Sequence, residues 1–190
     1  MPLELRLNGV ERTAAVEPAT TLLELLHDVF GMADVRYGCG EGVCGTCTVL
    51  LDGEPVSACL LLAIQAAGRE VVTLTGLMRD DGGMHPLQAA FLQCGASQCG
   101  FCTPGMVLTA HALCERVRMP TRDDIRYELV GNLCRCTGYT KIFEAIERYV
   151  AERHAAAGDA IDGHGDGHGD GHGERHGDGH GDGQGRGDGS

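Results

Sequence analysis

Alternating apolar and polar residues at the start of the chain predict an antiparallel β-hairpin. Leu3, Leu5 and Leu7 alternate with charged residues, and the pair Asn8-Gly9 follows directly. Both residues of this pair tolerate the left-handed backbone angles that a type I′ turn requires, which makes it the strongest short-range hairpin signal. We therefore expect two strands that turn at Asn8-Gly9.

The next apolar residues recur at helical spacing and predict a helix over about residues 21–30. Thr21 and Glu24 form a capping-box pattern at its start. Runs of aliphatic and β-branched residues between turn signals then predict further strands. These lie at residues 48–51, around Val56 and at residues 71–74. The first part of the chain is therefore expected to be a small sheet with one helix.

From residue 85 onward the apolar spacing changes to the helical period. Thr103 followed by Pro104 is a good N-cap and first-turn pair for one helix, and Thr121 is a good N-cap for another. Four helices around one core are expected. They span about residues 85–94, 104–118, 122–131 and 139–155.

Composition narrows the class of function. The chain has 190 residues, 10 cysteines and a formal net charge of −12 at pH 7, which argues against a nucleic-acid partner. Its start lacks the basic and apolar stretches of a secretory signal, so a reducing, cytoplasmic location is expected. Clustered cysteines there bind metal more often than they form disulfides. No run of residues is long and apolar enough to predict a membrane span.

The first cysteine set has the spacing of a plant-type [2Fe-2S] ferredoxin. Cys39, Cys44 and Cys47 follow the pattern C-x4-C-x2-C, and the predicted hairpin after them would bring Cys59 back beside their loop. Glycines between the cysteines would let the backbone curl and aim N–H groups at sulfur. A four-cysteine zinc site is the alternative, although structural zinc sites favour two short pairs.

The second cysteine set is split into two close pairs. Cys99 and Cys102 form C-x2-C, and Cys134 and Cys136 form C-x-C. Each pair precedes a predicted helix start, whose partial positive charge would favour thiolate over thiol. Four soft thiolates gathered in this way suit a metal cluster.

Residues outside the two sets carry weaker signals. Cys94 and Cys114 lie at helical core positions and are expected to be free thiols that act as small hydrophobes. His85 and His111 are expected to be surface or satisfied core residues. Residues 158–190 form a Gly/His/Asp-rich repeat with almost no apolar residue, so a disordered tail is expected. The tail is either simply solvated or a weak binder of transition metals.

The paired motifs CGEGVCGTC and QCGFCTPGM…GNLCRCTGY, in this order, resemble the small iron–sulfur subunits of the xanthine dehydrogenase family of molybdenum hydroxylases. The resemblance covers about residues 3–150. It implies an α+β fold in which residues 1–77 form a β-grasp, plant-type ferredoxin-like domain. Residues 84–155 would form a four-helix bundle-like domain, and residues 158–190 a disordered tail outside the family pattern.

The resemblance also implies the cofactors, one [2Fe-2S] cluster in each domain. The metal ligands would be Cys39, Cys44, Cys47 and Cys59 for one cluster, and Cys99, Cys102, Cys134 and Cys136 for the other. Gln98 and Cys136 would contact a molybdopterin cofactor, in its cytosine dinucleotide form, that a partner subunit holds. No catalytic residue is expected in this chain. Arg135 would either raise its cluster's potential or be a surface or interface cation.

The implied function is electron transfer within a hetero-oligomeric oxidoreductase. The chain has no room for a molybdenum or FAD domain. The expected partners are therefore a large molybdopterin-binding subunit and an FAD-binding medium subunit. Electrons would pass from the molybdopterin through both clusters toward FAD or another acceptor. The alternatives are a stand-alone ferredoxin-like carrier and a zinc-binding interaction module.

Overall fold

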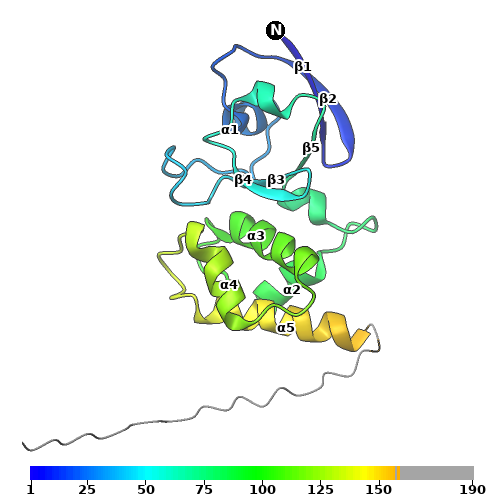
Figure 1. The fold of residues 1–190 in the computed structure, drawn as a ribbon, viewed down its shortest axis with the longest axis vertical. Coiled ribbons are helices and arrows are strands. Elements are labelled where there is room, and N and C mark those ends of the chain that lie inside the picture. The colour runs from blue at the N-terminus through cyan, green and yellow to red at the C-terminus, as the bar shows by residue number, and fades with distance from the viewer. Residues whose placement is uncertain (157, 159–190) are drawn as a thin grey trace, which may run out of the picture. The chain divides into compact units, whose positions relative to one another are not determined.

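A computed structural model describes residues 1–156 and 158 of the chain. In this part, five strands form one mixed sheet in the order β2-β1-β5-β3-β4 (Figure 1). The parallel pair is β1 with β5, and the other neighbours are antiparallel. The strands are β1 (Pro2–Leu7), β2 (Val10–Ala15), β3 (Thr48–Leu51), β4 (Glu54–Ser57) and β5 (Glu70–Val72).

The predicted hairpin turn between β1 and β2 is confirmed. Asn8 and Gly9 have φ angles of 51° and 79°, the left-handed conformation that a type I′ turn needs. The Asn8 side chain also binds Thr73, just after β5. Its Oδ1 accepts the Thr73 N–H at 2.8 Å and its Nδ2 donates to Thr73 Oγ1 at 3.1 Å. The turn is therefore anchored to the neighbouring strand.

The predicted first helix is confirmed at its start and differs at its end. At the N-terminus of α1 (Leu22–Glu24), Thr21 Oγ1 accepts the Glu24 N–H and the Glu24 carboxylate accepts the Thr21 N–H. The chain then continues as a wider π-helical turn, Leu25–Val29, which the apolar spacing does not predict.

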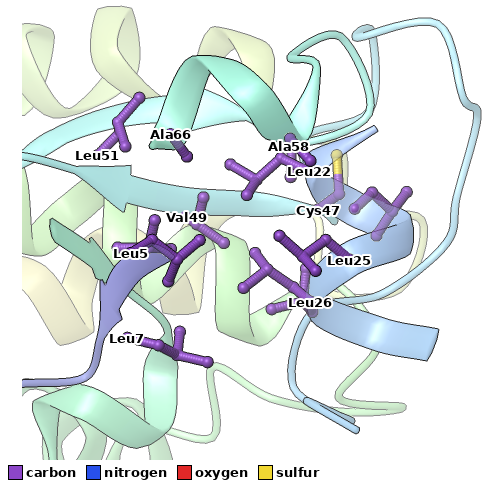
Figure 2. Close-up of a cluster of buried hydrophobic side chains, with 14 of the residues drawn as sticks. Leu5, Leu7, Leu22, Leu25, Leu26, Cys47, Val49, Leu51, Ala58 and Ala66 are labelled. Atoms are coloured by element: carbon purple, nitrogen blue, oxygen red, sulfur yellow. The ribbon is translucent and has the colours of Figure 1, made fainter. Parts of the chain in front are cut away.

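The first hydrophobic core lies between this helical segment and the sheet. Leu22 and Leu26 are buried against Leu5 of β1 and Val49 of β3 (Figure 2). Cys47, which directly precedes β3, is part of the same cluster and only 2% exposed. The first cysteine loop is thus fixed to the core at one end.

Four helices follow, and they enclose a second hydrophobic core. Phe91, Met106, Ile125 and Ile146, one from each helix, are almost completely buried there. The helices are α2 (Pro86–Gln93), α3 (Thr103–Arg116), α4 (Arg122–Glu128) and α5 (Thr140–Ala156). Three short 3₁₀ turns complete the elements of the described chain, at Ala63–Ala66, Leu74–Leu77 and Leu129–Gly131.

The sheet and the helices meet along α3, which lies beside β3 and β4 in Figure 1. Leu108 and Ala112 of α3 are buried with Leu50 of β3 in a small third cluster. This arrangement confirms the expected α+β fold, with a ferredoxin-like sheet followed by a four-helix part. Within the described residues, no helix combines the length and the apolar character needed to cross a membrane.

Three local details differ from the sequence predictions. Thr103 is not the N-cap of α3, because the helix already begins at that residue and Cys102 holds the cap position without a side-chain hydrogen bond. Thr103 Oγ1 instead lies 3.0 Å from Ser97 Oγ. His111 is not a satisfied core residue, since its buried Nδ1 has no hydrogen-bond partner among the described residues. The helix after Thr121 ends at Glu128 and continues as a 3₁₀ turn.

The two cysteines outside the sets are free. Cys114 is buried in the second core, as expected, whereas Cys94 is half-buried at the C-cap of α2. The predicted tail, residues 158–190, lies outside the described residues except for residue 158.

Candidate metal centres

The first cysteine loop bends back on itself through glycines. Gly40, Gly42 and Gly45 have φ angles of 72°, 74° and 65°, which side chains with a Cβ rarely adopt. This path points backbone N–H groups at sulfur. The Cys39 N–H donates to Cys44 Sγ at 3.4 Å, and the Glu41 N–H donates to Cys39 Sγ at 3.3 Å. Thiolates accept such bonds more strongly than thiols do.

The four cysteines of the first set lie together as two pairs. Cys39 interacts with Cys44, and Cys47 interacts with Cys59. Backbone donation from Glu41, followed by the Cys44 side chain, lowers the pKa of Cys39 to about 6. Burial, followed by the neighbouring thiol of Cys59, raises the pKa of Cys47 to about 11. The hairpin of β3 and β4 therefore returns Cys59 to the loop, as the sequence predicts.

The loop leaves no room for a side chain at its first glycine. A Cβ on Gly38 would overlap Thr46 Oγ1 and Cys44 Sγ. The Thr46 hydroxyl donates to the Arg36 carbonyl at 3.4 Å and lies 3.3 Å from Cys44 Sγ. The backbone is thus wrapped closely around the thiols.

The second set is also arranged as two pairs, although its members are far apart in sequence. Cys136 Sγ lies 3.6 Å from Cys99 Sγ, and Cys102 interacts with Cys134. Burial, followed by the Cys134 side chain, raises the pKa of Cys102 to about 12. Backbone donation from Phe101 and then the Cys136 side chain lower the pKa of Cys99. The hydrogen bond to Cys99 is the main cause of the raised pKa of Cys136.

A turn after the second pair supplies donors to one thiol. Thr137 donates to Cys134 Sγ from its N–H at 3.4 Å and from its hydroxyl at 3.2 Å. Burial by itself would raise the pKa of Cys134. The hydrogen bonds outweigh this effect, so the net pKa is lowered. The expected effect of the partial positive charge of two helix starts is therefore only partly realised. α3 begins at Thr103, directly after Cys102, whereas α5 begins at Thr140, beyond this turn.

Tyr139 holds this turn, and sequence reasoning did not identify it. Its hydroxyl accepts the Cys134 N–H at 2.9 Å and donates to the Asn132 carbonyl at 3.0 Å. Its φ of 68° is left-handed, which is uncommon for a residue with a bulky side chain. The motif CTGY places a tyrosine directly after a glycine. This pair is the sequence signal that could have indicated such a turn.

The two cysteine sets are joined by direct contacts between their loops. The Leu133 N–H donates to the Cys44 carbonyl at 2.9 Å. The buried Asn132 side chain donates from Nδ2 to the Gly45 carbonyl at 3.1 Å. A Cβ on Gly105 of α3 would overlap that same carbonyl oxygen. Leu133 and Asn132, just before Cys134, therefore contact Cys44 and Gly45 of the first cysteine loop.

The two sets differ in exposure. Cys99, Cys136 and Gln98 are exposed, whereas Cys47 is buried. The second set therefore has an open edge that consists of Gln98, Cys99 and Cys136.

The thiols fit [2Fe-2S] clusters by their donor chemistry and grouping. Such a cluster has four cysteine ligands, two on each iron. Each set brings four thiols together two by two, and N–H groups donate to them. Among the described residues, no three histidine, cysteine or acidic side chains converge as ligands of a single metal ion. When bound, such clusters accept and release single electrons.

Comparison with known proteins agrees with this geometry. Residues 5–75 match the 2Fe-2S iron-sulfur cluster binding domain, and residues 73–147 match the [2Fe-2S] binding domain. The nicotinate dehydrogenase small FeS subunit of Eubacterium barkeri is 49% identical over 153 residues, which cover 80% of this chain and 96% of that protein.

Two crystal structures are similar as well. The match to quinoline 2-oxidoreductase from Pseudomonas putida 86 has 41% identity and a TM-score of 0.78, and covers 84% of this chain and 98% of the matched chain. Aldehyde oxidoreductase from Desulfovibrio desulfuricans ATCC 27774 matches with 39% identity and a TM-score of 0.77, over 81% of this chain and 17% of that chain.

The fold and the two thiol sets thus define a two-part iron–sulfur protein of the [2Fe-2S] class. The chain belongs to the small iron–sulfur subunits of the xanthine dehydrogenase family of molybdenum hydroxylases. It is an electron-transfer subunit of an oxidoreductase, and catalysis in such complexes takes place in another subunit.

Proposed function

We propose that the chain relays single electrons from a molybdopterin site in a large partner subunit toward FAD in a medium subunit, or toward another acceptor. Two [2Fe-2S] clusters carry the electrons. The ligands are Cys39, Cys44, Cys47 and Cys59 in a domain of residues 1–77, and Cys99, Cys102, Cys134 and Cys136 in a domain of residues 84–155. The complex is assigned to the cytoplasm, where reduced thiols persist.

The observation that carries the proposal is the direct connection between the two thiol sets. The hydrogen bond from the Leu133 N–H to the Cys44 carbonyl joins a residue adjacent to Cys134 to a cysteine of the first set. A carrier with one cluster would not need this connection. A protein that passes electrons from one cluster to another would benefit from it.

Exposure supports the direction of the relay. Gln98 and Cys136 lie on the open edge of the second set, so a partner's cofactor can approach them without a rearrangement of the fold. The burial of Cys47 supports a less exposed position for the first set. We therefore propose that electrons enter the chain at the second set and leave it from the first set. In line with the family resemblance, the arriving electrons come from the cytosine dinucleotide form of molybdopterin.

Purification of the tagged full chain from its native host tests the assignment of partners. A large subunit that contains molybdenum and a medium subunit that contains FAD are expected to purify with it. A monomeric chain with neither subunit would favour a stand-alone carrier.

A Gln98→Ala variant of the complex tests the site of electron arrival. The iron content should be unchanged, while reduction of the clusters by the substrate slows roughly tenfold to a hundredfold, because a lost contact misplaces the two cofactors. Gln93→Ala is the control, since Gln93 is exposed and lies outside both sets. Equal rates for the two variants would contradict the role of Gln98.

A further inference from the structure

Arg36 belongs to the first cysteine loop by its backbone. It precedes Cys39, and its carbonyl accepts the Thr46 hydroxyl at 3.4 Å. The same hydroxyl lies 3.3 Å from Cys44 Sγ. The position of the Arg36 backbone is therefore coupled to the thiols of the first set.

Its side chain, in contrast, reaches the second set. Arg36 Nη1 donates to the Gly100 carbonyl at 2.6 Å, and the guanidinium lies over the Phe101 ring, 5.4 Å from its centroid. Gly100 and Phe101 are the two residues between Cys99 and Cys102, and the Phe101 N–H donates to Cys99. Arg36 thus places a positive charge against the loop that carries two proposed ligands.

Among the described residues, no carboxylate forms an ion pair with Arg36. The side chain is half-buried, and its partners in the described part of the chain are a carbonyl oxygen and an aromatic ring. Other arginines of this part, such as Arg116 and Arg153, are paired with glutamates. A guanidinium stays protonated at any physiological pH, and partial burial reduces the screening of its field by water and salt.

A nearby positive charge favours the reduced state of an iron–sulfur cluster. Four thiolates, two sulfides and two ferric ions sum to a charge of −2, and reduction by one electron adds a further negative charge. A nearby cation lowers the energy of that added negative charge, so the reduction potential of the cluster rises. Because the guanidinium lies at Gly100 and Phe101, the effect should be larger for the second set than for the first.

We propose that Arg36 is a positioning residue that fixes the loop between Cys99 and Cys102 and selectively raises the reduction potential of the cluster held there. This inference rests on the proposed function. In the step concerned, one electron leaves the reduced cluster of the second set and reduces the oxidised cluster of the first set, with no bond made or broken. Arg36 makes arrival of the electron at the second set more favourable. It makes the free energy of onward transfer to the first set less favourable.

Redox titration of the full chain, followed by the EPR signal of each cluster, tests this role. In Arg36→Gln, the equilibrium constant for one-electron reduction of the second cluster should fall roughly tenfold, which is about 59 mV for a one-electron couple. The first cluster should change less. In Arg36→Lys, which keeps the charge, the constant should stay within about threefold of wild type. Arg122→Gln is the matched control, because Arg122 also stacks on a phenylalanine, Phe143, outside the cysteine loops.

Each outcome has a defined meaning. Unchanged potentials in Arg36→Gln, or equal shifts in Arg36→Gln and Arg36→Lys, would overturn the electrostatic role. If Arg36→Gln loses its iron, Arg36→Met provides the test, since it keeps the length of the side chain without its charge and should lower the second potential more than the first. An unchanged potential there would also overturn the inference. A wild-type chain without iron would instead refute the proposed function.

Discussion

Individual cysteines of each set experience opposite environments. The N–H of Glu41 lowers the pKa of the Cys39 thiol to about 6, whereas burial raises the pKa of Cys47 to about 11. The second set repeats this contrast between Cys99 and Cys102. All four ligands of a cluster must be thiolates, so the buried thiols give up their protons only when metal binds. In the first set, Cys39, with its pKa lowered to about 6, therefore ionises more readily than Cys47 before metal binds.

Gly105 illustrates how closely the two cysteine loops approach each other. A helix-interior glycine replaced by alanine usually gains about 1 kcal/mol. In Gly105→Ala, however, the new Cβ would overlap the Gly45 carbonyl oxygen. Overpacking of this kind costs about 1–3 kcal/mol. We therefore expect a free energy of unfolding up to about 2 kcal/mol lower than that of wild type, measured by urea denaturation.

Gly131→Ala is the control for this substitution. A Cβ at Gly131 would have no heavy atom within 4 Å, and its φ is not left-handed. Its free energy of unfolding should stay within about 0.5 kcal/mol of wild type. If Gly105→Ala were as stable as Gly131→Ala, the close approach of the loops would be wrong.

At the scale of elements, α2 depends on an unusual cap. His85 Nδ1 accepts the Leu87 N–H at 3.2 Å, and Gln88 completes the capping box by accepting the His85 N–H at 2.8 Å. Burial, followed by the nearby charge of His111, lowers the pKa of His85. The rings of His111 on α3 and Tyr149 on α5 pack against it. Only the neutral imidazole can accept the hydrogen bond of the cap.

His85→Asn should remove the pH dependence of this cap. Because the pKa of His85 is lowered in the folded protein, its stabilisation is present above the ordinary pKa of 6.5 and lost as the pH falls below it. Asparagine caps a helix without titrating. Between pH 7.5 and 5.5, wild type should lose about 1 kcal/mol more stability than His85→Asn, measured by urea unfolding. Equal losses would show that His85 does not control the cap.

The elements that could be predicted are those with short-range signals. Asn8-Gly9 specified its turn and Thr21 with Glu24 specified a helix start, because the residues involved are neighbours in sequence. The π-helical turn and the start of α3 at Thr103 could not be predicted, since packing and the contact with Ser97 decide them. The same holds for the site. Spacing indicates the cysteines, whereas the roles of Tyr139 and Asn132 depend on contacts that only folding creates.

On the scale of the whole molecule, every proposed ligand lies within the described residues, in one compact unit. The Gly/His/Asp-rich tail contributes no cysteine. We therefore expect truncation after Ala157 to leave the iron content and both EPR signals unchanged. Loss of either signal would assign the tail a role in holding a cluster.

The central claim is that the chain holds two separate [2Fe-2S] clusters, one in each cysteine set. Iron and acid-labile sulfide analysis combined with EPR of the dithionite-reduced full chain tests it most directly. About four iron and four sulfide per chain and two EPR signals are expected in wild type. Cys134→Ser should keep about two of each and a single signal, while Cys94→Ser, outside both sets, should match wild type. Stoichiometric zinc without sulfide, or an unchanged iron content in Cys134→Ser, would contradict the claim.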